Sequence, residues 1–225
     1  AGDDAHIETE RTTGYVSDLV SKANGRFQGA AISIGHTRWA THGGVTDYNA
    51  HPHSSQDGNI TIVHNGIIEN SNQLSRRVSK LGYELTSETD TEVIVHLLDH
   101  EIKTQPEGEG PLEAFSRVIN QLQGSWAIAA MISGLKGILV SRMGAPMVIG
   151  KGQNNISVSS DVLPFYGACS EVSYMRDGDN FFLDEDGIHA LEDNEIPEFE
   201  ILEGVYDEED PGNFPHMMMK EIHDQ

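Results

Sequence analysis

Residues 30–66 read AAISIGHTRWATHGGVTDYNAHPHSSQDGNITIVHNG and place a dense group of polar side chains between two apolar runs. The first run, 30–35, alternates isoleucine with small residues, which predicts a half-buried strand. The second run, 60–63, predicts another strand that delivers His64-Asn65-Gly66 at a turn. Because strands that release polar groups at one end commonly present a site, we interpret this stretch as a functional loop.

Helices are predicted on both sides of this stretch from the periodicity of apolar residues. Two of them begin with the spacing of a capping box, Asn70 with Gln73 and Thr89 with Glu92. Pro111 suits the first turn of another. The expected helices cover 16–23, 70–82, 111–124 and 214–223, with a further one starting at 89.

After residue 124 the pattern changes to short apolar runs separated by Gly, Ser and Pro, which is typical of strands. Turn residues at 154–155 and 184–187 predict two hairpins. Residues 1–9 are expected to form a turn leading into a strand, and the acidic segment 192–210 an exposed strand with loops. The expected strands after residue 124 are 126–132, 137–141, 147–149, 156–159, 181–183 and 188–191. Strands around a helical middle predict one layered α+β domain over residues 1–225.

The composition is that of a globular protein with a sizeable core. The chain has 225 residues, of which 37% are hydrophobic, and no apolar run approaches the length of a membrane span. No basic-then-apolar leader opens the sequence, so we expect a cytoplasmic protein with no membrane partner. The single cysteine, Cys169, excludes an internal disulfide framework.

The formal net charge is −22, from 36 acidic and 14 basic residues. Such a surface repels phosphate backbones, so we expect no nucleic-acid partner. Two interpretations of the charge stay open: a highly soluble enzyme, or adaptation to a salty cytoplasm in which screening relieves the self-repulsion.

Two charged residues of this region suit the two ends of an α-amino acid. The guanidinium of Arg38 matches a carboxylate, and Asp90, at an expected helix start, could accept from an ammonium or simply cap the helix. After the second strand, Asn65-Gly66 could supply an oxyanion hole from a side-chain amide and a backbone N–H, or form an ordinary turn.

Four segments in order resemble the class II glutamine amidotransferases, and the resemblance covers most of the chain. Within that family they look most like the glutaminase domains of the aminotransferases that convert fructose 6-phosphate to glucosamine 6-phosphate. The chain's last seven residues, from Met219, resemble the point where such a domain passes to its sugar-isomerase half. The four segments are His36–Gly43, Asn49–His53, His64–Asn70 and Ser87–Glu92.

The resemblance implies an N-terminal-nucleophile hydrolase fold, with two antiparallel sheets sandwiched between helices, and hydrolysis of glutamine without a cofactor or metal. It implies ammonia delivery to a sugar phosphate on a downstream isomerase domain, through which the protein could form a homodimer. It also assigns roles to residues: Arg38 would hold the glutamine carboxylate and Asp90 the α-amino group, with Asn65 and Gly66 as the oxyanion hole. Three more would line or close the pocket, namely Trp39, Thr41 and His42.

The family's nucleophile is an N-terminal cysteine, and this chain begins with Ala1. Cys169 lacks a free α-amine and is expected to be a core residue. We therefore expect either an upstream segment that carries the nucleophile or a chain that does not hydrolyse glutamine.

The same residues allow three other interpretations. The amidophosphoribosyltransferase and asparagine synthetase families share the amidotransferase domain. A non-catalytic amino-acid-binding domain would use the same pocket. The third interpretation is a metal hydrolase, suggested by the 11 histidines and the H-x-H pair of His51 and His53. This spacing is weak evidence for a metal site without a matching carboxylate.

Overall fold

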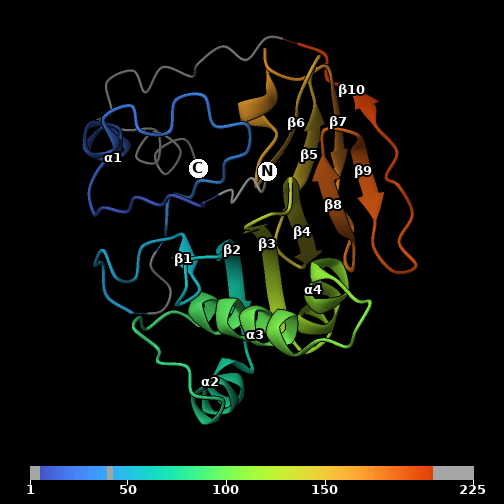
Figure 1. Ribbon diagram of the computed structural model, residues 1–225. Coiled ribbons are helices and arrows are strands. Elements are labelled where there is room, and N and C mark those ends of the chain that lie inside the picture. The colour runs from blue at the N-terminus through green and yellow to red at the C-terminus, as the bar shows by residue number, and fades with distance from the viewer. Residues whose placement is uncertain (1–5, 40–42, 205–225) are drawn as a thin grey trace, which may run out of the picture.

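The computed structural model describes residues 6–39 and 43–204 and shows an α+β domain built in layers (Figure 1). The larger sheet has six antiparallel strands in the order β1-β2-β3-β4-β8-β9. The strands are β1 His53–Ser54, β2 Ile60–Ile68, β3 Gly124–Ile132, β4 Gly137–Met143, β8 Asn180–Asp184 and β9 Gly187–Ala190. The smaller antiparallel sheet has the order β10-β7-β5-β6. Its strands are β5 Val148–Lys151, β6 Ile156–Ser159, β7 Glu171–Tyr174 and β10 Glu200–Ile201.

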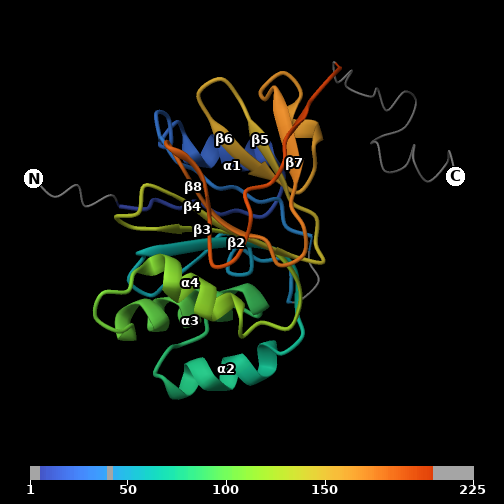
Figure 2. The ribbon, with the colours of Figure 1, turned by 90° about the vertical axis from the view of Figure 1, so that its right-hand side faces the viewer.

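Helices flank the two sheets (Figure 2). On the outer face of the six-stranded sheet lie α3 and α4, with α2 beyond them, while α1 lies on the side of the four-stranded sheet. The helices are α1 Val16–Ala23, α2 Ser71–Lys80, α3 Asp90–Thr104 and α4 Pro111–Ile119, with a 3-10 turn at Leu163–Phe165. None of the described helices combines the length and the hydropathy that a bilayer crossing needs.

The central strand β3 shows how the sequence builds two cores at once. Trp126, Ile128 and Ala130 point into the cluster beneath α2, α3 and α4, whereas Ala127 and Ala129 point into the cluster between the two sheets. Successive side chains of a strand face opposite sides, so a nearly continuous apolar run fits a strand that is buried on both faces. Small alanines on the inner face let the second sheet approach closely.

Most of the predicted elements are confirmed. Helix α1 ends at Asn24, which adopts a left-handed conformation, and Pro111 opens α4. Both expected hairpins form, β5 with β6 and β8 with β9. Strand β10 is the only strand within the described part of the acidic segment.

Two predicted elements near the site are wrong. Residues 30–35 pair with no strand in the described ranges, although Ile32 and Ile34 are half-buried between exposed neighbours, as the alternation predicted. His64-Asn65-Gly66 is not a turn, because β2 continues through it and pairs with β3 as far as Ile68. A longer ladder with β3 outweighs the local turn preference of an Asn-Gly pair.

Both predicted capping boxes are also wrong, although both helices start where expected. Asn70 donates to Gln121 O at 2.9 Å and accepts from Gln123 N at 3.1 Å, so its amide ties α2 to the start of β3. Glu92 accepts from the backbone N–H groups of Thr86 and Ser87 instead of from the residue before α3. Residues 6–9 form no strand, and the helix expected at 214–223 lies outside the described residues.

Candidate functional site

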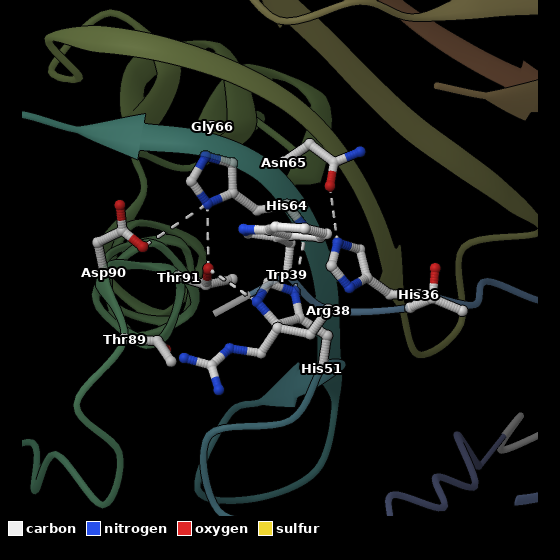
Figure 3. Close-up of a pocket in the computed structure, with 11 residues that line it drawn as sticks. His36, Arg38, Trp39, His51, His64, Asn65, Gly66, Thr89, Asp90 and Thr91 are labelled. Atoms are coloured by element: carbon white, nitrogen blue, oxygen red, sulfur yellow. Dashed lines mark hydrogen bonds and ion pairs between the residues drawn. The ribbon is translucent and has the colours of Figure 1, made fainter. Parts of the chain in front are cut away.

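A pocket of ≈150 Å³ lies where the extended segment 36–39, the second half of β2 and the first turn of α3 meet (Figure 3). It brings together five residues that the sequence singled out: Arg38, Trp39, Asn65, Gly66 and Asp90. The other lining residues are His36, Thr37, His51, His64, Thr89 and Thr91. Thr41 and His42, also expected here, lie outside the described residues.

Gly66 fixes the shape of β2 at the pocket. Its backbone φ of +123° is one that residues other than glycine rarely adopt. An added Cβ would also lie 2.2 Å from the carbonyl oxygen of Ser125 on β3. Only glycine therefore lets the two strands approach here. Beside it, Asn65 Oδ1 lies 2.8 Å from His36 Nε2. Because that oxygen accepts from the imidazole, the amide nitrogen of Asn65 is the group left to donate to a ligand.

Asp90 opens α3 but does not cap it. Its Oδ2 accepts from the backbone N–H of Ile68 at 2.8 Å, which ties the helix start to β2. Its Oδ1 lies 3.9 Å from His64 Nδ1. The carboxylate thus stands at the pocket wall with one oxygen held by the strand, and the simple capping interpretation is wrong.

Arg38 lies in the extended segment 36–39, which follows the half-buried Ile32 and Ile34 and lines the pocket. It continues the alternation of burial through Ile34 and His36, which explains why His36 and Arg38 point to the same side. Its guanidinium donates to Gly44 O at 2.9 Å and to Gly43 O at 3.4 Å. The neighbouring Trp39 is 76% exposed and also lines the pocket.

Three neutral imidazoles, those of His36, His51 and His64, line the pocket with the two charged groups, and a fourth, His53, contacts the ring of His51. His36 and His51 stack with ring centroids 4.2 Å apart, and the backbone N–H of His64 donates to His51 Nδ1 at 3.3 Å. Burial lowers the pKa of His51 to about 2 and that of His53 to about 4, and it also lowers the pKa values of His36 and His64. At neutral pH these rings are therefore uncharged donors and acceptors, and the pocket's charge comes from Arg38 and Asp90.

The histidines do not form a metal centre in the part of the chain that the structure describes. No group of three or more His, Cys, Asp or Glu side chains there is arranged to hold a metal ion. His53, one of the H-x-H pair, places Nε2 3.0 Å from the Thr89 hydroxyl. The pair is thus built into the scaffold of the pocket.

Cys169 lies elsewhere, on the outer side of the four-stranded sheet. It packs against the small cluster of Val148, Phe165 and Val172, and burial raises the pKa of its thiol. A partly buried thiol with a raised pKa is a poor nucleophile, and Cys169 lies at the edge of this small cluster instead of fully inside a core.

The sequence alone did not identify His64 and Thr91 as site residues. His64 Nδ1 lies 3.0 Å from the Thr91 hydroxyl, a contact between residues 27 apart in the chain. A signal was present, because each directly neighbours a predicted site residue, Asn65 or Asp90. What was missing was the pairing of β2 with the start of α3.

The chain is similar in sequence and in fold to known proteins. A family model described as "Glutamine amidotransferase domain" matches residues 36–165. Among curated proteins, the glutamine–fructose-6-phosphate aminotransferase (isomerizing) of Sulfurisphaera tokodaii is 36% identical over 97% of this chain and 37% of its own length. That of Neisseria meningitidis serogroup B is 39% identical over 99% of this chain and 37% of its own length.

Two solved structures share the fold. A glutamine phosphoribosylpyrophosphate amidotransferase from B. subtilis, complexed with ADP and GMP, superposes with a TM-score of 0.56 at 23% identity. The match covers 71% of this chain and 34% of that one. A structure titled the allosteric regulatory enzyme of purine biosynthesis gives 0.57 at 25% identity and covers 69% and 33%.

These likenesses identify the two antiparallel sheets between helices as a fold of the N-terminal-nucleophile hydrolase type. The chain spans 37% of the length of the first two curated relatives that it matches. The family model covers more than half of the chain, including every residue that lines the pocket. The chain belongs to the glutamine amidotransferase domain family.

Proposed function

We propose that the pocket binds L-glutamine, with the α-carboxylate on Arg38 and the α-ammonium on Asp90. The observation that carries the proposal is that these two opposite charges line one pocket together with Asn65 and Gly66. Charge-assisted hydrogen bonds to the two ends of an amino acid are among the stronger polar contacts in proteins, at about 1.5–3 kcal/mol each. The neutral histidines around them add no competing charge.

The same arrangement suits hydrolysis of the side-chain amide. Attack on that amide places negative charge on its oxygen, and the amide nitrogen of Asn65 with the backbone N–H of Gly66 would stabilise the charge. We expect Trp39, Thr41 and His42 to close the pocket over the ligand. The attacking thiol is not Cys169, so we propose that a cysteine outside these 225 residues supplies it.

We further propose that the released ammonia aminates fructose 6-phosphate to give glucosamine 6-phosphate. Support comes from relatives named glutamine–fructose-6-phosphate aminotransferase (isomerizing), which match nearly all of this chain. Since the chain spans 37% of their length, a sugar-phosphate isomerase domain is the partner that this activity requires. In this proposal such a domain would also carry any homodimer contact.

A second candidate is a domain that binds glutamine without cleaving it. It is favoured by one observation, that the only cysteine of the chain lies away from the pocket. The amidotransferase and the binding domain share the pocket and differ only in glutamate release.

Calorimetric titration of the chain with L-glutamine, beside an assay for released glutamate, tests both. We expect one glutamine per chain, with affinity lowered on the order of tenfold or more in Arg38→Met and in Asp90→Asn. Arg176→Met, which removes an exposed arginine that does not line the pocket, serves as the control. Absence of glutamine binding in the parent chain would contradict the proposal. Binding without glutamate release, even in a longer chain that carries the proposed cysteine, would favour the binding domain.

A further inference from the structure

The Gly43-Gly44 turn holds Arg38 from one side and is itself held from the other. Gly44 O accepts from Arg38 Nη1 at 2.9 Å and from Asn49 Nδ2 at 3.0 Å, so one carbonyl lies between the guanidinium and the amide. The N–H of Gly44 donates to Glu88 Oε2 at 3.1 Å. The turn is therefore fixed through both the N–H and the carbonyl of Gly44.

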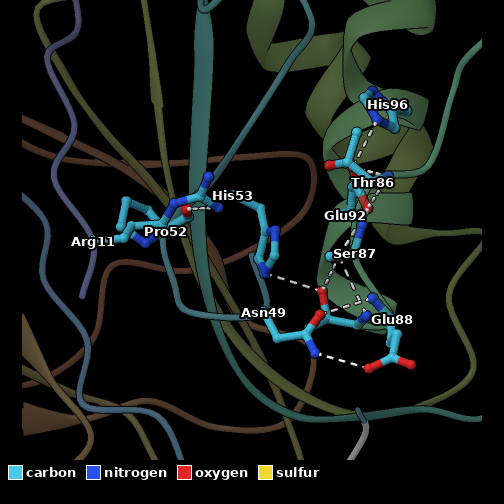
Figure 4. A network of polar contacts seen from close by, with 10 residues as sticks. Arg11, Asn49, Pro52, His53, Thr86, Ser87, Glu88, Glu92 and His96 are labelled. Carbon is cyan, nitrogen blue, oxygen red and sulfur yellow. Dashed lines mark hydrogen bonds and ion pairs between the residues drawn. The ribbon is translucent and has the colours of Figure 1, made fainter. Parts of the chain in front are cut away.

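Asn49 and Glu88 form a closed set of hydrogen bonds with each other (Figure 4). Asn49 Nδ2 donates to Glu88 Oε2 at 2.9 Å, and the backbone N–H of Glu88 donates to Asn49 Oδ1 at 2.9 Å. Asn49 is only 2% exposed, so these bonds satisfy a buried amide that would otherwise destabilise the fold. The same contacts lower the pKa of the Glu88 carboxyl, which stays ionised at neutral pH.

The space around this set of bonds is filled. A Cβ on Gly43 would lie 2.7 Å from Asn49 Nδ2 and 2.7 Å from Glu88 Cβ. The turn thus packs directly on both side chains, and only glycine fits at 43.

Glu88 stands two residues before Asp90, and the segment between them is anchored independently. Ser87 donates through its N–H and its hydroxyl to Glu92 at 2.7 Å each, and the Thr89 hydroxyl lies 3.0 Å from His53 Nε2. Figure 4 shows these bonds as one network leading from the first turn of α3 to Asn49. A rigid connection therefore runs from the position of Asp90 to that of Arg38.

We propose that Asn49 and Glu88 are positioning residues that set Arg38 against the α-carboxylate of the ligand at a fixed separation from Asp90. Neither side chain lines the pocket, so both act through the Gly43-Gly44 turn. This inference rests on the proposed function, because it assigns them a role in the recognition of glutamine. Their contribution is specific to the carboxylate end, since the turn contacts Arg38 and not the amide-binding side.

The test uses two ligands that differ only at that end: L-glutamine and 4-aminobutanamide, which is glutamine without its α-carboxylate. Binding of each is measured by NMR titration to the parent chain and to Asn49→Ala, Glu88→Ala and Glu88→Gln. Asn194→Ala is the matched control, because Asn194 likewise bridges backbone groups, Asn180 N and Gly178 O, but beside β8, which β3 and β4 separate from β2 in the sheet. Melting temperatures show whether each variant is folded. If Asn49→Ala does not fold, the two Glu88 variants still provide the test, because Glu88 is exposed.

We expect Asn49→Ala and Glu88→Ala to weaken glutamine binding on the order of tenfold, the effect of one or two lost hydrogen bonds, and to leave 4-aminobutanamide binding unchanged. Glu88→Gln keeps an acceptor oxygen and should recover most of the affinity. Equal losses for both ligands, or unchanged glutamine binding in both alanine variants, would overturn this inference alone. Failure of the parent chain to bind glutamine would instead overturn the proposed function on which it rests.

Discussion

Gly66 shows how much of the site depends on one missing side chain. Its φ of +123° and the 2.2 Å distance from an ideal Cβ to Ser125 O leave no room for alanine. We expect Gly66→Ala to lower the free energy of unfolding by about 3 kcal/mol or more, because backbone strain and a clash with main chain add. Denaturant titration measures the loss.

The control for this substitution is Gly58→Ala. Gly58 also has a positive φ, +74°, but an added Cβ meets nothing within 4 Å. Only the conformational strain then remains, and we expect a loss of about 1 kcal/mol. Equal losses in the two variants would show that the approach of β2 to β3 at Gly66 is not a constraint.

His53 makes stability depend on pH. Its pKa is lowered by burial to about 4, whereas an unfolded histidine titrates near 6.5. Between these values the unfolded chain binds the extra proton, so the stabilisation is complete above pH 6.5 and is lost as the pH falls towards 4. Relative to His53→Gln, the parent should lose about 2 kcal/mol of unfolding free energy between pH 7 and pH 5.

Denaturant titrations of both proteins at the two pH values measure this difference. The carboxylates are common to the two proteins, so their titration cancels in the comparison. A parent that loses no more stability than His53→Gln would mean that His53 is protonated, or free to become so, in the folded state.

The charged residues of the site could be predicted from the sequence, but their supporting network could not. Arg38 and Asp90 follow from the chemistry of an amino-acid ligand, and the structure places both in one pocket. The Asn49–Glu88 contacts join residues 39 apart, and no local pattern reports such a pairing. Residue type indicates what a group can bind, whereas tertiary packing decides which neighbour it meets.

At the scale of elements, hydrophobic periodicity predicted burial more reliably than pairing. Residues 31–39 alternate between exposed and half-buried as a strand would, yet they form no ladder with any described strand. Conversely, β2 runs through the Asn-Gly pair because β3 offers a partner along its whole length. Side-chain pattern fixes which face is buried, but a ladder also needs a neighbouring strand in register.

The start of helix α2 also shows that a local sequence pattern does not determine which partner a side chain contacts. Asn70 satisfies the pattern of a cap, but its amide both donates to Gln121 O and accepts from Gln123 N. Asn70→Asp retains a good capping residue and removes the donor. We therefore expect it to lower the free energy of unfolding by about 1 kcal/mol, the net contribution of one hydrogen bond. A neutral or stabilising effect in denaturant titration would instead support the capping role.

For the whole molecule, the net charge of −22 is the dominant long-range term. Charges repel over roughly 10 Å at 0.1 M salt but only about 3 Å at 1 M. We expect the melting temperature to rise as KCl is increased over this range, since screening relieves the self-repulsion of the folded state. KCl is chosen because sulfate and phosphate stabilise folded proteins generally. A melting temperature that is constant or falls would show that the acidic surface does not limit stability.

In the proposed complex, Arg38 and Asp90 hold the two charged ends of one glutamine beside Asn65 and Gly66. A crystal structure of the chain with L-glutamine would show these contacts. We expect the α-carboxylate on the Arg38 guanidinium, the α-ammonium on Asp90, and the side-chain amide oxygen facing Asn65 and Gly66. Glutamine bound in the reverse orientation, or outside this pocket, would contradict the proposal.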